Sequence, residues 1–457
     1  MVPLLIAVVL DPPSPPQKFA QDLLLVSSVT AICKLLETIP EFLSPHLVNI
    51  LVGISSISVS EELFLHAEGP YKNQLTQRIP KIRDLLTFKT PTRSFLPAIS
   101  TAFCSLSEKS KHRAIVPLMD LLKKHLESLS KEDANAAANH FVNFFVGTAL
   151  DFRAKSAHSL EEAEIKVVED GIVDACVAMV MRMSEPTFRP FFFRLYDWAV
   201  EDDSSSSSSS SSTTKDRILT FYVASARIGE NLKALFGMFI GHVMKNVVQV
   251  LKRNCVSPKI DEPMDEDAQV EASTPPTSRL PPVFDSDAKN VLLLRFVLDT
   301  LTTVFKYDKK GEVAKENFDA LHVPLVDLLE NVIILKEDVA EEEGEEKMFE
   351  SFVDRHLAPC IGSMAAAAND FGIWKKLTYQ ICLKTKSDSM RSRIRAIVVL
   401  EAVALRIGQE FLGLLPETAP FLAELMEDEE EAVEKRVQEF IHVLEEQLGE
   451  NLQKYFT

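Results

Sequence analysis

The sequence has 457 residues, of which 46% are hydrophobic and 14 are glycine, and its formal net charge is −18 at pH 7. That charge excludes a protein that binds nucleic acid or anionic membrane over its whole surface, although it permits a local basic face. The low glycine content and the near absence of alternating apolar and polar residues favour helices over strands. The six cysteines are scattered singly without a CxxC motif, which indicates buried thiols in a reducing compartment.

The amino-terminal part of the chain has the pattern of helical hairpins. Residues 1–10 are apolar, but they lack a basic n-region and a cleavage site and are too short to span a membrane. We expect them to form a helix that packs against something further upstream, which would make this chain the end of a longer protein. Two amphipathic helices follow at residues 25–39 and 44–54, joined by a short corner at Pro40. Because this unit recurs, we predict HEAT-like helical repeats over residues 1–110.

The most unusual stretch, SEPTFRPFFFRLYDWA, covers residues 184–199. We expect Pro190 to occupy the first helical position, where its missing N–H costs nothing. Large apolar side chains then point nearly all round, so the helix should be buried between neighbours, with a docking surface as the alternative. The signature residues of this stretch are Phe188, Pro190, Phe191, Phe192, Phe193, Tyr196 and Trp198. Nine consecutive serines follow, and they predict a flexible Ser-rich loop over residues 201–216.

The second half shows an internal repeat. A long helical pattern ends near residue 253, and residues 254–283 are acidic and rich in proline, which predicts a linker without a core of its own. Beyond it, shifting the sequence by 41 residues aligns Ala396 with Val437 and Gly408 with Gly449. A period of about 40 residues with two helices per unit is typical of HEAT repeats. We therefore predict an all-α fold, an α-solenoid of HEAT-like hairpins with disordered linkers, whose carboxy-terminal repeats occupy residues 284–457.

No strong enzyme signature is present. The sequence lacks GxGxxG, GxxxxGK[ST], HExxH and GxSxG motifs. His356 and Cys360 share a helix face at i,i+4, but nothing supplies an orienting acid or oxyanion donors, so a packed helix is the preferred interpretation. The histidines do not cluster at metal-ligand spacing. We predict no catalytic residues, no cofactor, no metal and no small-molecule substrate.

Two basic islands interrupt the acidic background, at residues 72–93 and 375–406. Each could line an edge of the solenoid and bind phosphates. The alternatives are a solvated face or a complement to the acidic residues 424–434 of a neighbouring repeat. The candidate face for RNA or a partner consists of Lys375, Lys376, Lys384, Lys386, Arg391, Arg393 and Arg395. No aromatic base-stacking platform is evident beside these charges.

Several long strings resemble the carboxy-terminal domain of the HEAT repeat-containing protein 1 family, the counterpart of yeast U-three-associated protein ten. They are residues 144–153 (FFVGTALDFR), 184–199, 217–236 (RILTFYVASARIGENLKALF), 284–308, 356–362 and 414–434. The resemblance covers essentially the whole chain and implies a family-specific helical domain over residues 111–253. Family members are much longer, so the chain looks like only their carboxy-terminal end, and the serine run and acidic linker look like insertions.

The resemblance implies a nuclear and nucleolar scaffold of ribosome biogenesis. Its partners would be small-subunit processome proteins, with pre-rRNA or small nucleolar RNA as further candidates, and it would support early processing toward the small-subunit RNA and RNA polymerase I transcription. Two alternatives stay open. One is direct, sequence-independent RNA binding through residues 375–406, and the other is a HEAT adaptor in nuclear transport or phosphatase scaffolding, since a fold does not determine a function. No membrane partner is expected.

Overall fold

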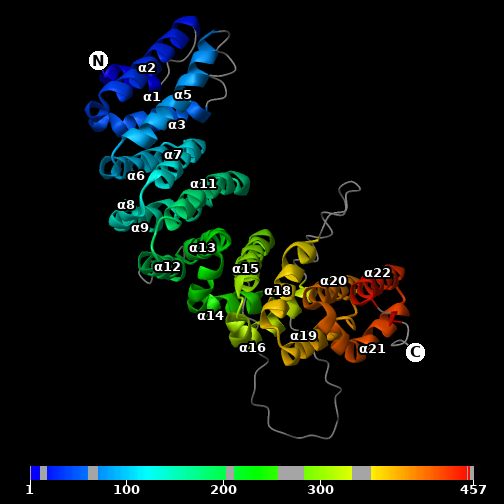
Figure 1. Ribbon diagram of the computed structural model, residues 1–457. Helices are drawn as coiled ribbons and strands as arrows, with labels where there is room; N and C mark the ends of the chain where they lie inside the picture. The colour runs from blue at the N-terminus through cyan, green and yellow to red at the C-terminus, as the bar shows by residue number, and fades with distance from the viewer. Residues whose placement is uncertain are drawn as a thin grey trace. The chain divides into compact units, whose positions relative to one another are not determined.

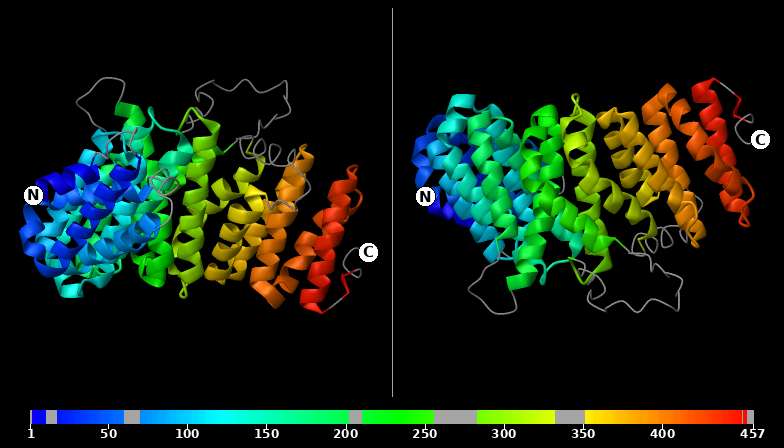
Figure 2. Two further views of the ribbon diagram at one scale, coloured as in Figure 1. Left: turned by 90° about the horizontal axis from the view of Figure 1, so that it is seen from above. Right: turned by 90° about the horizontal axis from the view of Figure 1, so that it is seen from below.

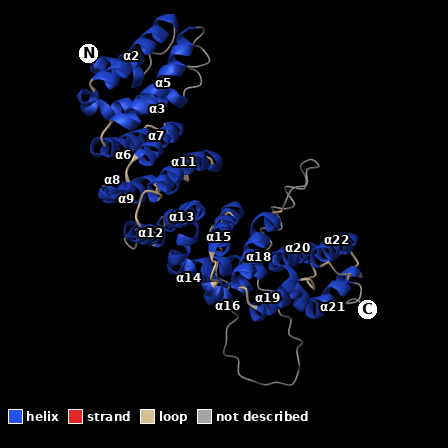
Figure 3. Ribbon diagram, in the orientation of Figure 1, coloured by secondary structure: helices blue, strands red, loops and turns tan. Residues whose placement is uncertain are grey.

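The computed structural model describes residues 2–10, 18–59, 70–201, 210–255, 283–331, 351–449 and 451–452, and within these ranges the regular structure is entirely helical (Figures 1 and 3). The chain divides into two compact units, Met1–Asn231 and Leu232–Thr457. In each unit the helices alternate between two stacked layers, so the predicted all-α solenoid of HEAT-like hairpins is confirmed. The unit boundary falls inside the region 111–253 that we expected to form one domain.

The first unit places alternate helices in the two layers. α2, α5, α7 and α11 pack side by side in one layer, while α3, α6 and α9 follow one another in the other. The helices are α1 (Val2–Leu10), α2 (Lys18–Thr38), α3 (Leu47–Val59), α5 (Pro70–Lys89), α6 (Thr92–Glu108), α7 (Ile115–Ser128), α8 (Lys131–Ala136), α9 (Ala138–Phe144), α10 (Phe152–Ser156), α11 (Glu162–Val180), α12 (Glu185–Val200) and α13 (Ser210–Leu232). Short 3-10 turns, η1 (Pro40–His46) and η2 (His112–Ala114), and a π turn, η3 (Phe145–Ala149), connect some of them.

The apolar helix α1 packs on α2 and α3 of its own chain. Its Ile6 and Val9 side chains are buried. A Cβ atom at Gly53 of α3 would lie 2.6 Å from a Val9 methyl group, so α1 reaches α3 this closely because residue 53 is glycine. α1 therefore packs on the helices that follow it, and the contact with something further upstream stays a prediction.

The aromatic stretch forms α12, which begins earlier than we predicted. Ser184 is the N-cap and Pro186 lies in the first turn, so Pro190 is inside the helix. The prediction for Pro190 was wrong because the Ser184 carbonyl already accepts hydrogen bonds from the N–H groups of residues 187 and 188, which start the helix one turn sooner. The structure buries Phe188, Phe191, Phe192, Leu195, Trp198 and Ala199, and leaves Phe193 and Tyr196 half-buried.

The two insertions lie mostly outside the described residues. α13 begins at Ser210, so residues 210–216 are helical although we expected the Ser-rich loop to extend over residues 201–216. The remainder of that loop, residues 202–209, and residues 256–282 of the acidic linker fall outside the described ranges.

The second unit repeats the same architecture. α14, α16, α19 and α21 form one layer, and α15, α18, α20 and α22 form the other (Figures 1 and 2). Their bounds are α14 (Gly237–Asn254), α15 (Asp287–Tyr307), α16 (Glu312–Asp327), α18 (Ala358–Ala368), α19 (Phe371–Lys384), α20 (Met390–Ile407), α21 (Leu415–Met426) and α22 (Glu431–Leu448). Short turns η4 (Lys233–Leu235), η5 (Leu328–Glu330), η6 (Val353–Leu357, a π turn) and η7 (Gly408–Leu414) complete the unit.

The internal repeat appears directly in the helix boundaries. α20 and α22 begin at residues 390 and 431 and end at residues 407 and 448, so both ends are 41 residues apart. Each helix is followed by a glycine with positive φ, Gly408 at +72° and Gly449 at +69°. Glycine suits these positions because a side chain is strained in the left-handed region.

In the second layer of this unit, α18 and α20 approach each other closely. A Cβ atom at Gly362 would lie 3.0 Å from the Ala402 carbonyl oxygen. Ala365 and Ala368 of α18 are completely buried. Small side chains therefore allow these two backbones to come nearly into contact.

Candidate functional site

A buried ion-pair network joins three helices of the first unit. Arg153 of α10 is 1% exposed, and it donates two hydrogen bonds to Glu169 of α11, at 2.9 Å from Nε and 2.6 Å from Nη2. Its Nη1 reaches Glu162 at 2.6 Å, and the Thr220 hydroxyl of α13 donates to Glu169 at 2.6 Å. Burial alone would lower the pKa of Arg153, but the two glutamates outweigh it and raise that pKa, so the guanidinium stays charged.

A second buried carboxylate lies beside this network. Asp151 accepts hydrogen bonds from Arg217 Nε at 2.8 Å and from the Trp198 indole N–H at 3.2 Å. The Arg217 guanidinium also lies 5.7 Å from the centre of the Trp198 ring. The strings at residues 144–153, 184–199 and 217–236 thus meet at two acid–base clusters, which fix α12 and α13 against the preceding repeat.

The aromatic side chains of α12 continue this contact. The ring centres of Phe192 and Phe221 of α13 are 5.8 Å apart, and the Tyr196 ring packs edge-on against the Phe221 ring at a centre-to-centre distance of 5.6 Å. Such pairs add to the energy of apolar burial. Within the described residues, the unusual composition of α12 therefore serves mainly to bind its neighbouring helices.

The first basic island, residues 72–93, lies mainly on α5 and ends on α6, and basic side chains of α5 form ion pairs with neighbouring helices. Lys81 forms an ion pair with Glu37 of α2, and Arg83 contacts Asp120 of α7 at 2.5 Å. Further along the same layer, Lys123 of α7 pairs with Asp174 of α11 at 3.1 Å, and Arg227 of α13 pairs with Asp170 and Asp174 at 2.7 and 2.5 Å. Ion pairs thus connect α2, α5, α7, α11 and α13 in that order.

The second basic island behaves similarly, because α19 lies between two acidic helices. Its lysines, together with Lys386 just after it, pair on one side with α16 and η5 and on the other with α21. The pairs are Lys376–Asp319 (3.9 Å), Lys384–Asp327 (2.9 Å), Lys384–Glu330 (2.8 Å), Lys375–Glu417 (2.5 Å) and Lys386–Glu424 (2.9 Å). Lys384 is 11% exposed. Burial acts to lower its pKa, but hydrogen bonds to both carboxylates prevail and raise it.

The arginines of α20 are also held within the unit. Arg393 contacts Asp428 at 2.9 Å, and buried Arg395 donates to the Leu329 carbonyl at 3.3 Å. Arg391 is half-buried in the first turn of the helix. Only part of the candidate face is therefore exposed. Lys375, Lys376 and Lys386 keep at least half of their side-chain surface exposed, whereas Lys384 and the three arginines are largely enclosed.

Aromatic side chains accompany the exposed lysines, although the sequence pattern did not reveal them. Tyr379 of α19 is 53% exposed and packs edge-on against Phe421 of α21, with ring centres 6.5 Å apart. Lys386 Nζ lies 5.2 Å from the centre of the Phe421 ring. This α19–α21 surface combines flat rings with cations, but Glu417 and Glu424 lie within it.

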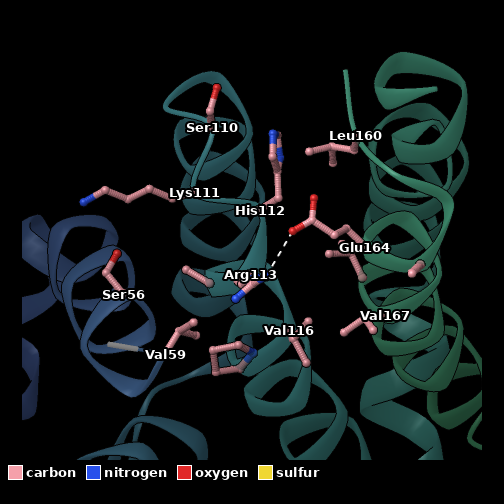
Figure 4. A pocket seen from close by; sticks show the side chains of 14 residues that line it. Ser56, Val59, Ser110, Lys111, His112, Arg113, Val116, Leu160, Glu164 and Val167 are labelled. Atoms are coloured by element: carbon pink, nitrogen blue, oxygen red, sulfur yellow. Dashed lines mark hydrogen bonds and ion pairs between the residues drawn. The ribbon is translucent and has the colours of Figure 1, made fainter. Parts of the chain in front are cut away.

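A groove of about 930 Å³ lies in the first unit (Figure 4). α3 supplies Ser56 and Val59 on one side, and Leu160, just before α11, lies on the other side with Glu164 and Val167 of α11; the segment from Ser110 to Pro117 lies between them. The groove is open, and its lining is mainly apolar. Arg113 bridges it to Glu164 at 3.1 Å.

His356 and Cys360, the pair considered for catalysis, each have another partner. The hydrogen-bond partner of His356 Nδ1 is Asp299 Oδ1, at 2.7 Å, and not the Cys360 thiol. Burial raises the pKa of the Cys360 thiol to about 12, so the thiolate nucleophile is not formed near neutral pH. Among the described residues, no His, Cys, Asp and Glu cluster is arranged to hold a metal ion, and no helix is long and apolar enough to cross a bilayer.

The alternative that residues 424–434 complement the second island is seen in the pairs Lys386–Glu424 and Arg393–Asp428, but sequence reasoning missed the other acidic partners and the members of the buried clusters. Asp151 and Arg153 stand in the LDFR string, and a charged pair in an otherwise apolar string is the one signal that could have indicated a buried ion pair. The groove has no sequence signal, because three helices far apart in the chain contribute to it.

Comparison with known proteins identifies relatives along almost the whole chain. Residues 133–313 match the BP28CT (NUC211) domain family. HEAT repeat-containing protein 1 is 36% identical over 95% of this chain in Danio rerio and over 96% in Homo sapiens. U3 small nucleolar RNA-associated protein 10 of Candida glabrata is 23% identical over 92% of this chain. The chain spans only 18–20% of the length of these relatives.

A solved structure supports the fold. The karyopherin Kap121p, crystallised with the extreme C-terminus of the protein phosphatase Cdc14p, aligns with 99% of this chain and 38% of its own, with a TM-score of 0.52 and 14% identity. At this identity the likeness shows the solenoid fold and nothing about cargo.

Proposed function

We propose, on the premise that the chain is homologous over almost its whole length to HEAT repeat-containing protein 1, that the protein is a non-enzymatic scaffold of ribosome biogenesis. The observation that carries the proposal is the relationship to a U3 small nucleolar RNA-associated protein, which extends over both units. Its finer parts are a place in the small-subunit processome, support of early pre-rRNA processing and RNA polymerase I transcription, and residence in the nucleolus.

The physical character of the chain supports a scaffold. Ion pairs and aromatic contacts join neighbouring helices, and the thiols of Cys176 and Cys360 are buried with raised pKa values. What the solenoid offers instead is a long surface on which several proteins can bind at once. The domain division that accompanies the proposal is HEAT-like repeats over 1–110, the family-specific domain over 111–253 and carboxy-terminal repeats over 284–457.

The test is a purification of the tagged chain from nuclear extract, with and without RNase, followed by mass spectrometry of the retained proteins. The tag alone is the matched control. If proteins of the small-subunit precursor particle remain bound after RNase treatment, the scaffold proposal is supported. If they are lost with RNase, RNA is the tether and the protein-scaffold mechanism is wrong. If they never appear, the chain does not act in ribosome biogenesis on its own.

A second candidate function is direct RNA binding by the α19–α21 surface, which the exposed ring of Tyr379 beside Lys375 and Lys376 favours. Stacking on an aromatic ring contributes about 1–3 kcal/mol per base. Tyr379→Ala combined with Lys376→Gln should weaken binding of a single-stranded RNA and reduce its salt dependence. Leu405→Ala, at a residue of α20 that is 50% exposed, is the control. Equal binding by all three proteins would refute this candidate.

A further inference from the structure

The groove between α3, α7 and α11 has the character of a protein-docking surface. Val59 and Val116 are half-buried in it, and Val167 on its rim is 57% exposed. These three valines come from three different helices and face one hollow (Figure 4). Apolar side chains gathered in a concave, open site mark a binding surface more often than scattered ones do.

The charges of the groove lie at its rim. Lys111 and Arg113 are exposed, and the Arg113 side chain retains 77% of its surface. Glu164 is paired with Arg113, and within the described residues no ion pair involves Lys111. The rim therefore carries one net positive charge on a chain whose formal net charge is −18. A partner with apolar and acidic side chains is the one that this combination complements.

The layout favours a peptide over a small molecule. Small-molecule pockets bury a few precisely placed polar groups among apolar walls. Here the basic groups are solvent-exposed at the edge, while the centre is apolar, and this is the division into core and rim seen at protein interfaces. The volume of about 930 Å³ accommodates a few large side chains of one helix.

We propose that this groove binds an acidic amphipathic helix of a partner protein, with its apolar side chains on Val59, Val116 and Val167 and its carboxylates near Lys111 and Arg113. The inference rests on the proposed function in that a scaffold must bind proteins. It concerns the purified chain alone, however, so its failure would leave the purification from nuclear extract unaffected.

The experiment uses the full chain and a fluorescent 16-residue helical peptide with leucines at i, i+3, i+4 and i+7 and glutamates beside them. Fluorescence anisotropy should show binding by the unmodified protein. Val167→Asp and Lys111→Glu should each weaken it by about tenfold or more, since one removes apolar contact and the other reverses the attracting charge. Replacing the glutamates of the peptide by glutamine should also weaken binding. Met238→Asp, at a residue 54% exposed on α14, is the matched control and should bind like the unmodified protein.

Three results would overturn the proposal. The first is an absence of binding by the unmodified protein, and the second is equal binding by Val167→Asp and Met238→Asp. The third is a change from dimer to monomer caused by Val167→Asp in light scattering, which would identify the groove as a contact between two copies of the chain. Because Val167 is mostly exposed, its replacement should leave the helical circular dichroism unchanged, and that spectrum separates lost binding from lost folding.

Discussion

Removal of the buried Arg153 side chain should be among the most destabilising single changes in the first unit. In Arg153→Met, the carboxylate of Glu169, whose side chain is 5% exposed, loses both hydrogen bonds from the guanidinium. A buried charge left without its partner costs about 3–5 kcal/mol. Glu169→Met should cost less, because Arg153 keeps its contact with Glu162 at 2.6 Å.

The double variant Arg153→Met/Glu169→Met is the decisive protein. It places two apolar side chains where a charged pair was buried, and such replacements are often close to neutral. We expect the double variant to lose about 3 kcal/mol less unfolding free energy than the two single variants lose in sum. The double variant still loses some stability, because the Thr220 hydroxyl no longer has Glu169 as its hydrogen-bond acceptor.

The assay follows from the position of the two tryptophans. Trp198 belongs to the first unit and Trp374 to the second, so the fluorescence of Trp198 in a Trp374→Phe background reports urea unfolding of the first unit. Arg194→Met, at an exposed residue of α12, is the control and should change the free energy of unfolding by less than about 0.5 kcal/mol. Additive effects of the two core substitutions would refute the view that Arg153 and Glu169 act as one unit.

Three further predictions concern single residues. Burial lowers the pKa of His125, against the opposing effect of its hydrogen bond to the Thr87 carbonyl, so the unfolded chain takes up a proton more readily and stability should fall as the pH drops below about 6.5. Urea unfolding at about pH 7.5 and 5.5 should show a smaller loss for His125→Gln; an equal loss would assign the pH dependence to other groups. Ser110 has a φ of +54°, so Ser110→Gly should raise the unfolding free energy by about 1 kcal/mol, and a decrease would contradict this. Exposed Cys104 should react with a maleimide long before buried Cys360, whose thiol has a pKa of about 12. Equal labelling rates of the two cysteines, measured by mass spectrometry, would show that the helices around Cys360 open readily.

The sequence allowed the fold to be predicted because helical spacing and a 41-residue repeat are local or periodic signals. The boundaries of α20 and α22 follow that repeat at both ends. The start of α12 was predicted wrongly because two prolines, Pro186 and Pro190, both suit a first turn, and the N-cap at Ser184 favours the first of them.

The candidate site was less predictable, since its members pair over long separations. Arg217 and Asp151 are 66 residues apart, and Lys384 lies 54 residues from Glu330. A basic island seen only in sequence has the same appearance whether its lysines face phosphates or the carboxylates of the next repeat. Which of these applies depends on how the helices align, and that alignment is set by buried core residues of α19 such as Leu377 and Ile381.

The two layers of the second unit are spaced by side chains of very different length. Between α18 and α20 the spacers are a glycine and alanines, and between α16, α19 and α21 they are lysines reaching carboxylates. At α18 and α20 the two backbones are therefore closer than long side chains would allow, and a difference in width between the two layers bends a stack of repeats into an arc. Bulkier residues at positions such as 362 would flatten that arc without removing any repeat, so the curvature available to a partner is set by the size of a few small side chains.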